Sequence, residues 1–272
     1  KDSNLQIKEL TTGKLIWKSK EFCTQFDWHP SKNSIVFIEK NINNTSVNIF
    51  NCDTKKTHQL LKKNKNILLL RFLPQGNLLG IIFLEGLPNS HGYTSSLTLL
   101  DKNGIIKKNL PIKNINNFTV SPDEKFLAYS QYLEDSWELS TIEIINLSTE
   151  NSMFSDPNNN IINPFFSLQD NNLIYCTLDN KPKIYMINLK DGKKELLAEE
   201  IDYSYIDNFN WLDSSRLIYL TGSFSTQLKI LDINSKKTYF ISEGICPFVK
   251  NKNIYFIKDN YLYKIDMSLH KN

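Results

Sequence analysis

The chain of 272 residues is 40% hydrophobic and 22% charged, with a formal net charge of +3. This balance supports a sizeable core and excludes a wholly disordered or collagen-like polypeptide. No stretch approaches the roughly 18 apolar residues that a transmembrane helix requires, so we expect no membrane-spanning segment in the chain.

Basic residues and cysteines narrow the function classes further. The basic residues are almost all lysines spread along the chain, and the exceptions are Arg71 and Arg216. Because the planar arginine side chain is a main group for recognising bases and phosphates, we expect no nucleic-acid partner.

No cysteine pair has the spacing of metal ligands, which favours free thiols. One or two disulfides remain the alternative in an oxidising compartment. The cysteines are Cys23, Cys52, Cys176 and Cys246.

An internal repeat of about 44 residues runs through the chain. One recurring segment is a short strand that ends in an acid or amide, whose side chain can start a turn. Its seven copies begin at Leu5, Val47, Leu97, Ile142, Ile184, Leu228 and Leu262. A turn and another predicted strand follow it, as in residues 11–14 and 14–17.

A second recurring segment is a solid apolar block, which predicts a strand buried on both faces. The blocks cover residues 35–38, 79–83, 127–129, 173–175, 217–220 and 254–257. A short strand and a tight turn precede each block, as in residues 118–123. Each unit therefore has four strands, of which the inner ones lie between two like sheets, as in a propeller blade.

The strand count predicts an all-β, six-bladed β-propeller of four-stranded antiparallel blades. Two strands come from the N-terminal segment, twenty from five full units and three from the C-terminal segment. We expect a single domain over residues 1–272, with blades at residues 26–61, 70–110, 118–154, 164–198, 209–241, and 247–267 plus 4–18. Pairing of the N-terminal and C-terminal strands would complete the last blade and hide its edge. Seven blades are the alternative.

The third blade resembles a known family. Residues 118–130, Phe-Thr-Val-Ser-Pro-Asp-Glu-Lys-Phe-Leu-Ala-Tyr-Ser, are similar to the signature of TolB-like propellers with PD40-type repeats, with Glu124 in place of the usual glycine. Residues 184–193 resemble the stretch that closes each such repeat, and the dipeptides typical of WD40 repeats are absent. The resemblance implies a propeller that is often extracytoplasmic and often binds proteins, while some relatives are fused to peptidases and a few are enzymes.

The sequence offers little for catalysis. The four histidines lie on different predicted blades or loops, and no G-x-S-x-G elbow, phosphate loop or dinucleotide fingerprint is present. We therefore predict no catalytic residue, no cofactor and no bound metal. The predicted inner strands begin with apolar residues, which favours binding over catalysis in a central funnel. These residues are Phe26, Leu70, Phe118, Phe165, Phe209 and Phe248.

Three loops, at residues 84–96, 131–138 and 199–207, are longer than tight turns require. They interleave aromatic rings with carboxylates, which suits an interaction surface because rings supply anchors and acids orient the partner. The alternative is that the rings pack their own loops. The candidate partner-binding residues are Tyr93, Tyr132, Glu134, Asp135, Trp137, Asp202, Tyr203 and Tyr205.

We interpret the chain as a monomeric, non-enzymatic scaffold that binds a protein outside the cytoplasm, in the periplasm or at the cell surface. Its start at Lys1 instead of Met is consistent with removal of a signal peptide, a lipid anchor or a further domain. The alternative functions are a sugar- or peptide-binding module and an enzyme with a site in the central funnel. The alternative location is the cytoplasm.

Overall fold

The structure, a computed structural model, describes most of the chain. The described residues are 4–9, 11–42, 44–63, 65–85, 94–133, 136–156, 160–167, 172–177, 180–200, 205–222, 225–250, 253–259 and 261–267. They contain 25 strands and no α-helix, and thus no helix that could cross a membrane. The chain packs into two compact units, residues 1–116 and 117–272.

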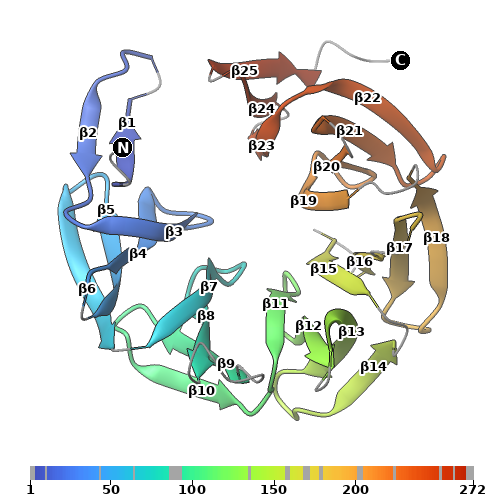
Figure 1. The fold of residues 1–272 in the computed structure, drawn as a ribbon, viewed down its shortest axis with the longest axis horizontal. Helices are drawn as coiled ribbons and strands as arrows, with labels where there is room; N and C mark the ends of the chain where they lie inside the picture. The colour runs from blue at the N-terminus through green and yellow to red at the C-terminus, as the bar shows by residue number, and fades with distance from the viewer. Residues whose placement is uncertain are drawn as a thin grey trace. The chain divides into compact units, whose positions relative to one another are not determined.

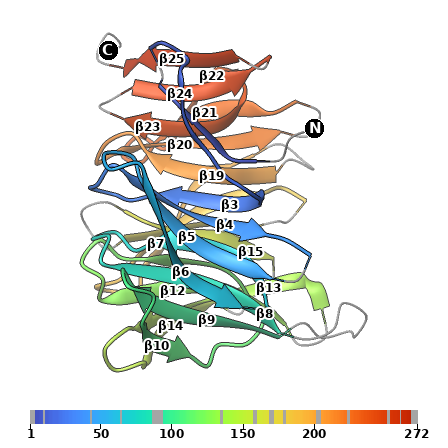
Figure 2. The same cartoon turned by 90° about the vertical axis from the view of Figure 1, so that its left-hand side faces the viewer.

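The first unit contains a hairpin and two four-stranded sheets, which we name blades 1 and 2 (Figure 1). The hairpin comprises β1 (Gln6–Lys8) and β2 (Leu15–Lys18). Blade 1 comprises β3 (Phe22–Trp28), β4 (Ser34–Lys40), β5 (Thr45–Asn51) and β6 (Lys56–Lys63). Blade 2 comprises β7 (Asn66–Phe72), β8 (Leu78–Glu85), β9 (Thr94–Asp101) and β10 (Ile106–Leu110). Figure 2 shows the strands of blade 1 side by side in chain order.

The second unit contains blades 3 to 6, each lying beside the next along the chain (Figure 1). Blade 3 comprises β11 (Ile115–Val120), which starts at the unit boundary, β12 (Phe126–Leu133), β13 (Ser136–Asn146) and β14 (Ser152–Asp156). Blade 4 comprises β15 (Ile161–Phe166), β16 (Asn172–Thr177), β17 (Lys183–Asn188) and β18 (Lys194–Glu199). Blade 5 comprises β19 (Tyr205–Trp211), β20 (Arg216–Gly222), β21 (Gln227–Asp232) and β22 (Lys237–Glu243). Blade 6 has three strands, β23 (Ile245–Lys250), β24 (Asn253–Lys258) and β25 (Tyr261–Asp266).

This strand arrangement confirms the predicted fold class, an all-β propeller with six blades. The apolar blocks form the second strand of each blade, and in blades 1 to 5 they are buried on both faces, as expected for a strand between two sheets. Consecutive residues show this: Val36 and Phe37 of β4 are both 0% exposed, and so are Leu217 and Ile218 of β20. In blade 6 only alternate residues of the block are buried, namely Ile254 and Phe256. The expected blade limits and the single domain remain predictions.

The predicted turn chemistry is also present. The Asp101 carboxylate at the end of β9 accepts hydrogen bonds from the backbone N–H groups of Asn103 and Ile105, at 2.9 and 3.0 Å. The Asn146 side chain does the same for Ser148 at the end of β13, at 2.8 Å. Acids and amides therefore end the third strands because they satisfy the backbone of the following turn.

The hydrophobic core is divided among successive blades. Separate clusters of buried side chains join blade 1 to blade 2, blade 3 to blade 4, blade 4 to blade 5 and blade 5 to blade 6. Amide side chains add hydrogen bonds between neighbouring inner strands. Asn163 of β15 donates to the Ile206 carbonyl of β19 at 3.3 Å, and Asn210 donates to the Pro247 carbonyl of β23 at 3.1 Å.

The predicted pairing of the chain ends would join the two units, and it stays a prediction. Within the units, β1 pairs with β2, and β23, β24 and β25 form a three-stranded sheet. The apolar side chains of the hairpin pack on blade 1. The Trp17 ring lies 4.6 Å from Phe50 and 4.9 Å from Phe37, and Ile7 is buried in the same cluster.

Candidate functional site

The loops that join second to third strands emerge beside the start of the next blade. In the first unit, the buried Ser95 of β9 donates a hydrogen bond to the Ile115 carbonyl at the start of β11, at 2.7 Å. In the second unit, Ser140 of β13 donates to the Ile161 carbonyl at the start of β15. We call this end of the sheets the loop face of each unit.

Three of the predicted partner-binding residues lie at this loop face. Tyr132 of β12 is half-buried and pairs with Ser140 of β13. Trp137 is the second residue of β13. Tyr205 is the first residue of β19, where it pairs with Gly222. The side chains of Trp137 and Tyr205 lie outside the described part of the structure. So do the remaining predicted residues, which are Tyr93, Glu134, Asp135, Asp202 and Tyr203.

A cavity of about 310 Å³ opens at the loop face of the second unit, between blades 5 and 6. Three short turns contribute its lining. These lining residues are Ser225, Thr226, Glu243, Gly244, Ile245, Ile257, Lys258 and Asp259. Sequence reasoning missed this cavity because no single stretch carries it, and each turn on its own resembles an ordinary connection.

Gly244 fixes the wall of the cavity. Its N–H donates to the Thr226 carbonyl at 3.1 Å, which ties the connection after β22 to the turn before β21. A Cβ atom at Gly244 would lie 2.5 Å from the Phe256 ring and 2.9 Å from the Ile257 carbonyl oxygen, and its φ is +156°. Only glycine therefore lets this connection lie so close to β24.

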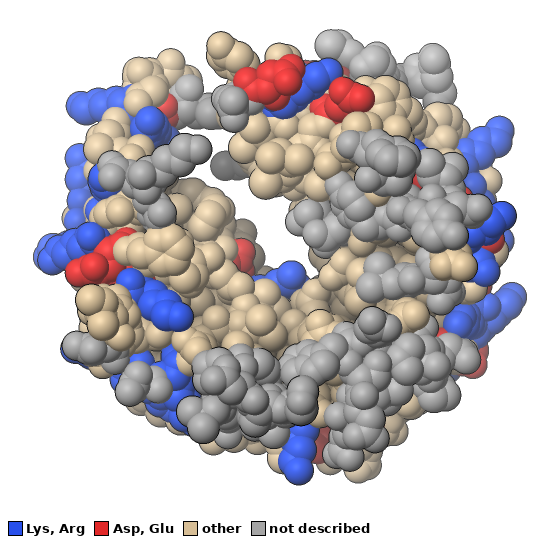
Figure 3. All heavy atoms as spheres, in the orientation of Figure 1, with Lys and Arg blue, Asp and Glu red and all other residues tan. Residues whose placement is uncertain are grey.

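The rim of the cavity carries the charges of Glu243, Lys258 and Asp259. Within the described residues, none of these three side chains makes an ion pair. Figure 3 shows acidic and basic side chains next to each other over the strands of blade 6. Ile245 adds an apolar surface that is 48% exposed. The site therefore combines three charged side chains without ion pairs in the described residues with the exposed aliphatic side chain of Ile245, which we call the floor of the cavity.

The other candidates for chemistry have structural roles. His29 Nδ1 accepts hydrogen bonds from the N–H groups of Ser31 and Lys32, at 3.1 and 3.0 Å, and its ring packs 4.8 Å from Phe72. Burial lowers the pKa of His29, and nearby Lys32 lowers it further. Among the described residues, no group of three or more His, Cys, Asp or Glu side chains could hold a metal ion.

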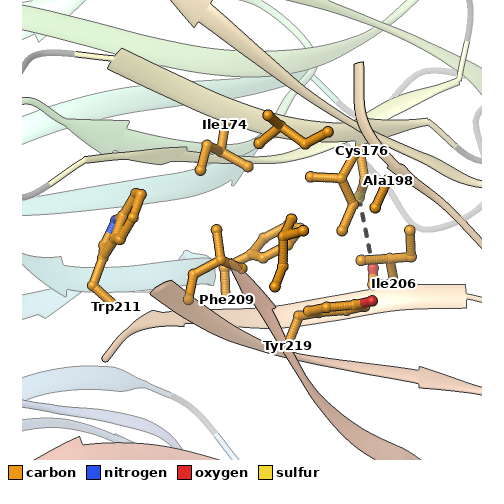
Figure 4. Close-up of a cluster of buried hydrophobic side chains, with 11 residues drawn as sticks. Ile174, Cys176, Ala198, Ile206, Phe209, Trp211 and Tyr219 are labelled. Atoms are coloured by element: carbon orange, nitrogen blue, oxygen red, sulfur yellow. Dashed lines mark hydrogen bonds between the residues drawn. The ribbon is translucent and has the colours of Figure 1, made fainter. Parts of the chain in front are cut away.

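All four cysteines are free thiols. Cys176 is buried between blades 4 and 5, where its Sγ contacts the Ile206 carbonyl at 3.7 Å among the apolar side chains drawn in Figure 4. Cys23 and Cys52 are half-buried and Cys246 is exposed. Burial raises the pKa of the Cys23 thiol. Cys23, Cys52 and Cys176 are therefore packing residues, and Cys246 is a surface thiol.

The apolar residues predicted to start the inner strands instead lie four or five residues into them, as Leu70 does in β7 and Phe118 in β11. Leu70, Phe118 and Phe209 are 2%, 1% and 7% exposed, because they point into the cores of their units. Phe26 and Phe248 are 53% and 45% exposed. Their exposure therefore differs from one inner strand to the next, and the preference for binding over catalysis stays a prediction.

The comparisons with known proteins support the fold. No protein-family profile and no curated protein sequence matches the chain. Tricorn protease matches with a TM-score of 0.73 at 13% identity, over 99% of this chain and 32% of that chain. TolB from Acinetobacter baumannii matches with 0.60 at 14%, over 89% and 60%. Oligogalacturonate lyase in complex with manganese matches with 0.68 at 10%, over 98% and 82%.

These likenesses define the class of protein as a six-bladed β-propeller with a TolB-like fold. The chain spans about a third of the length of tricorn protease and 60% of TolB. At these identities the likeness concerns the fold alone, and the same fold is found in proteases and in a lyase. Function therefore has to be argued from the loop face itself.

Proposed function

We propose that this propeller binds a protein partner through the loop face of its second unit, without catalysing a reaction. The observation that carries the proposal is the cavity between blades 5 and 6, which lies at the same end of the sheets as Tyr132, Trp137 and Tyr205. Aromatic residues and charged residues at the same end of a fold are typical of protein-binding surfaces. We further propose a monomeric, extracytoplasmic protein, in keeping with its TolB-like fold.

Site-specific photo-crosslinking tests this proposal. A photoreactive residue at position 132 samples the loop face, and one at position 148, in the turn after β13, samples the opposite end of the same blade. We expect a defined cross-linked partner from position 132 and none from position 148. Equal cross-linking from both positions, or none from either, would contradict binding at the loop face.

Once the partner is identified, Trp137→Ala should weaken its binding by about 1–3 kcal/mol if this ring is an anchor. The carboxylates predicted nearby should also make the binding weaken as salt concentration rises. Isothermal titration calorimetry at two salt concentrations measures both effects, and unchanged melting of the variant shows that it remains folded. Unchanged affinity in both Trp137→Ala and Tyr203→Ala would place the binding site elsewhere.

A further inference from the structure

We infer that the cavity between blades 5 and 6 binds an arginine or lysine side chain, and that the partner inserts this residue at the loop face. This inference rests on the proposed function and specifies the chemistry of one contact. The cavity is about 310 Å³, at the lower end of the roughly 300–1,000 Å³ of ligand pockets. That size suits a single long side chain better than a larger ligand.

The charges of the rim select a cation. Glu243 and Asp259 supply two carboxylates and Lys258 one ammonium group, a local balance of −1 (two acids minus one base). A guanidinium or ammonium group placed between the carboxylates would gain attraction from both. An anion would gain attraction from Lys258 alone and be repelled by both acids.

The apolar floor favours a long cationic side chain over a small cation. Ile245 of β23 and Ile257 of β24 pair directly across the sheet, and both line the cavity. The methylene stems of lysine and arginine pack on such aliphatic surfaces while the charged group stays at the polar rim. A hydrated metal ion would leave this floor exposed to water.

The wall of the cavity at Gly244 is constrained by a hydrogen bond and by a close contact. The hydrogen bond from Gly244 to Thr226 ties blade 6 to the turn of blade 5, and contact with Phe256 limits position 244 to glycine. A site that is already organised loses less free energy on ordering when the partner binds. The partner residue would therefore meet a wall that is already organised at Gly244.

A titration of the whole ¹⁵N-labelled chain with N-acetylarginine amide tests the inference by nuclear magnetic resonance. We expect saturable shifts of the backbone amides of Thr226, Gly244 and Lys258. The citrulline analogue has nearly the same shape without the charge and should cause shifts at least five-fold smaller at the same concentration. The double variant Glu243→Gln/Asp259→Asn should raise the apparent Kd for the arginine amide at least five-fold.

The matched control is Glu150→Gln, which removes an exposed carboxylate from the turn after β13 and should leave the titration unchanged. If the double variant does not fold, the two single variants take its place, each with at least a two-fold rise in Kd. Absence of shifts at the cavity, or equal shifts with citrulline or in the variants, would overturn the inference. A partner that still cross-links at position 132 would then leave the proposed function standing.

Discussion

At the scale of single residues, buried tyrosines join consecutive blades of the second unit through carboxylates. Tyr219 of blade 5 donates a hydrogen bond to Glu200, which follows the last strand of blade 4, and Lys229 contacts the other Glu200 oxygen at 2.7 Å. Tyr175 of blade 4 donates a hydrogen bond to Asp156 of blade 3 at 2.9 Å. The Lys194 ammonium group donates to the same Asp156 oxygen at 2.7 Å. Each carboxylate is therefore shared between a phenol and an ammonium group.

We predict that Tyr219→Phe lowers the free energy of unfolding by about 1.5–3 kcal/mol, because a hydrogen bond to a charged group is lost inside the protein. Burial, followed by the charge of Glu200, raises the pKa of Tyr219 above its ordinary value. This contribution to stability is complete below the unfolded pKa of about 10 and declines as the pH rises above it. Urea unfolding at pH 8 and pH 10.5 should show a smaller difference between wild type and variant at the higher pH. The exposed Tyr239→Phe is the control.

Asp27 provides a second pH-dependent contact, in the first unit. Its carboxylate on β3 accepts a hydrogen bond from the Phe72 N–H of β7 at 2.8 Å. Burial raises the pKa of Asp27, although this hydrogen bond and Arg71 oppose the shift. The raised pKa means that the folded state favours the protonated acid. Stability from this group is therefore full below the unfolded pKa of about 3.9 and is lost as the pH rises through the folded pKa.

We predict that Asp27→Asn gains stability relative to wild type as the pH rises from 3 to 7, because the amide oxygen can still accept from Phe72 and carries no charge. Chemical unfolding at the two pH values measures the change. Asp191→Asn, which removes an exposed carboxylate in the turn after β17, should show no comparable gain. If the free energy of unfolding of Asp27→Asn differs from that of wild type by the same amount at pH 3 and pH 7, burial does not destabilise the charged form of Asp27.

At the scale of elements, the N-terminal hairpin packs on the face of blade 1 that points away from blade 2. Trp17 stacks on Phe50 at an interplanar angle of 20° and meets the edge of Phe37. We predict that Trp17→Ala costs about 2–3 kcal/mol, since it removes aromatic packing from a half-buried position. Leu15→Ala, in the same strand but 49% exposed, should cost much less. Thermal melting of both variants makes the comparison, and equal losses would show that the hairpin does not pack through Trp17.

The strands and turns could be predicted because each depends on nearby residues. At the turn before β12, the Ser121 hydroxyl donates to Asp123 at 2.6 Å, and Glu124 takes a φ of 56° at the position where the TolB-like signature that this segment resembles has glycine. The turn thus forms even with the less suitable residue, because its hydrogen bonds are local. The packing of Trp17 on blade 1 could not be predicted, because it is a tertiary contact that repeat counting does not contain.

At the scale of the whole molecule, the sequence predicted the number of blades but only part of the candidate site. The aromatic residues of the long loops were proposed as candidates because those loops interrupt an economical repeat, and their role stays a prediction. The cavity of Glu243, Lys258 and Asp259 could not, because its residues come from turns of ordinary length and composition. Similarly, Tyr219 and Glu200 belong to different blades, and only the tertiary fold brings their side chains together.

The division of the core into clusters between neighbouring blades has a consequence for how the second unit opens. Each blade is stabilised by those it touches, so the unit should behave as a short linear array with nearest-neighbour coupling. Within this unit, blade 4 shares clusters with blades 3 and 5, whereas blade 6 shares one with blade 5 alone. Native-state hydrogen exchange should therefore find the amides of β24 opening at a lower free energy than those of β16, in a sub-global step. Simultaneous opening of both strands at the global unfolding free energy would instead mean that the array unfolds as one cooperative block.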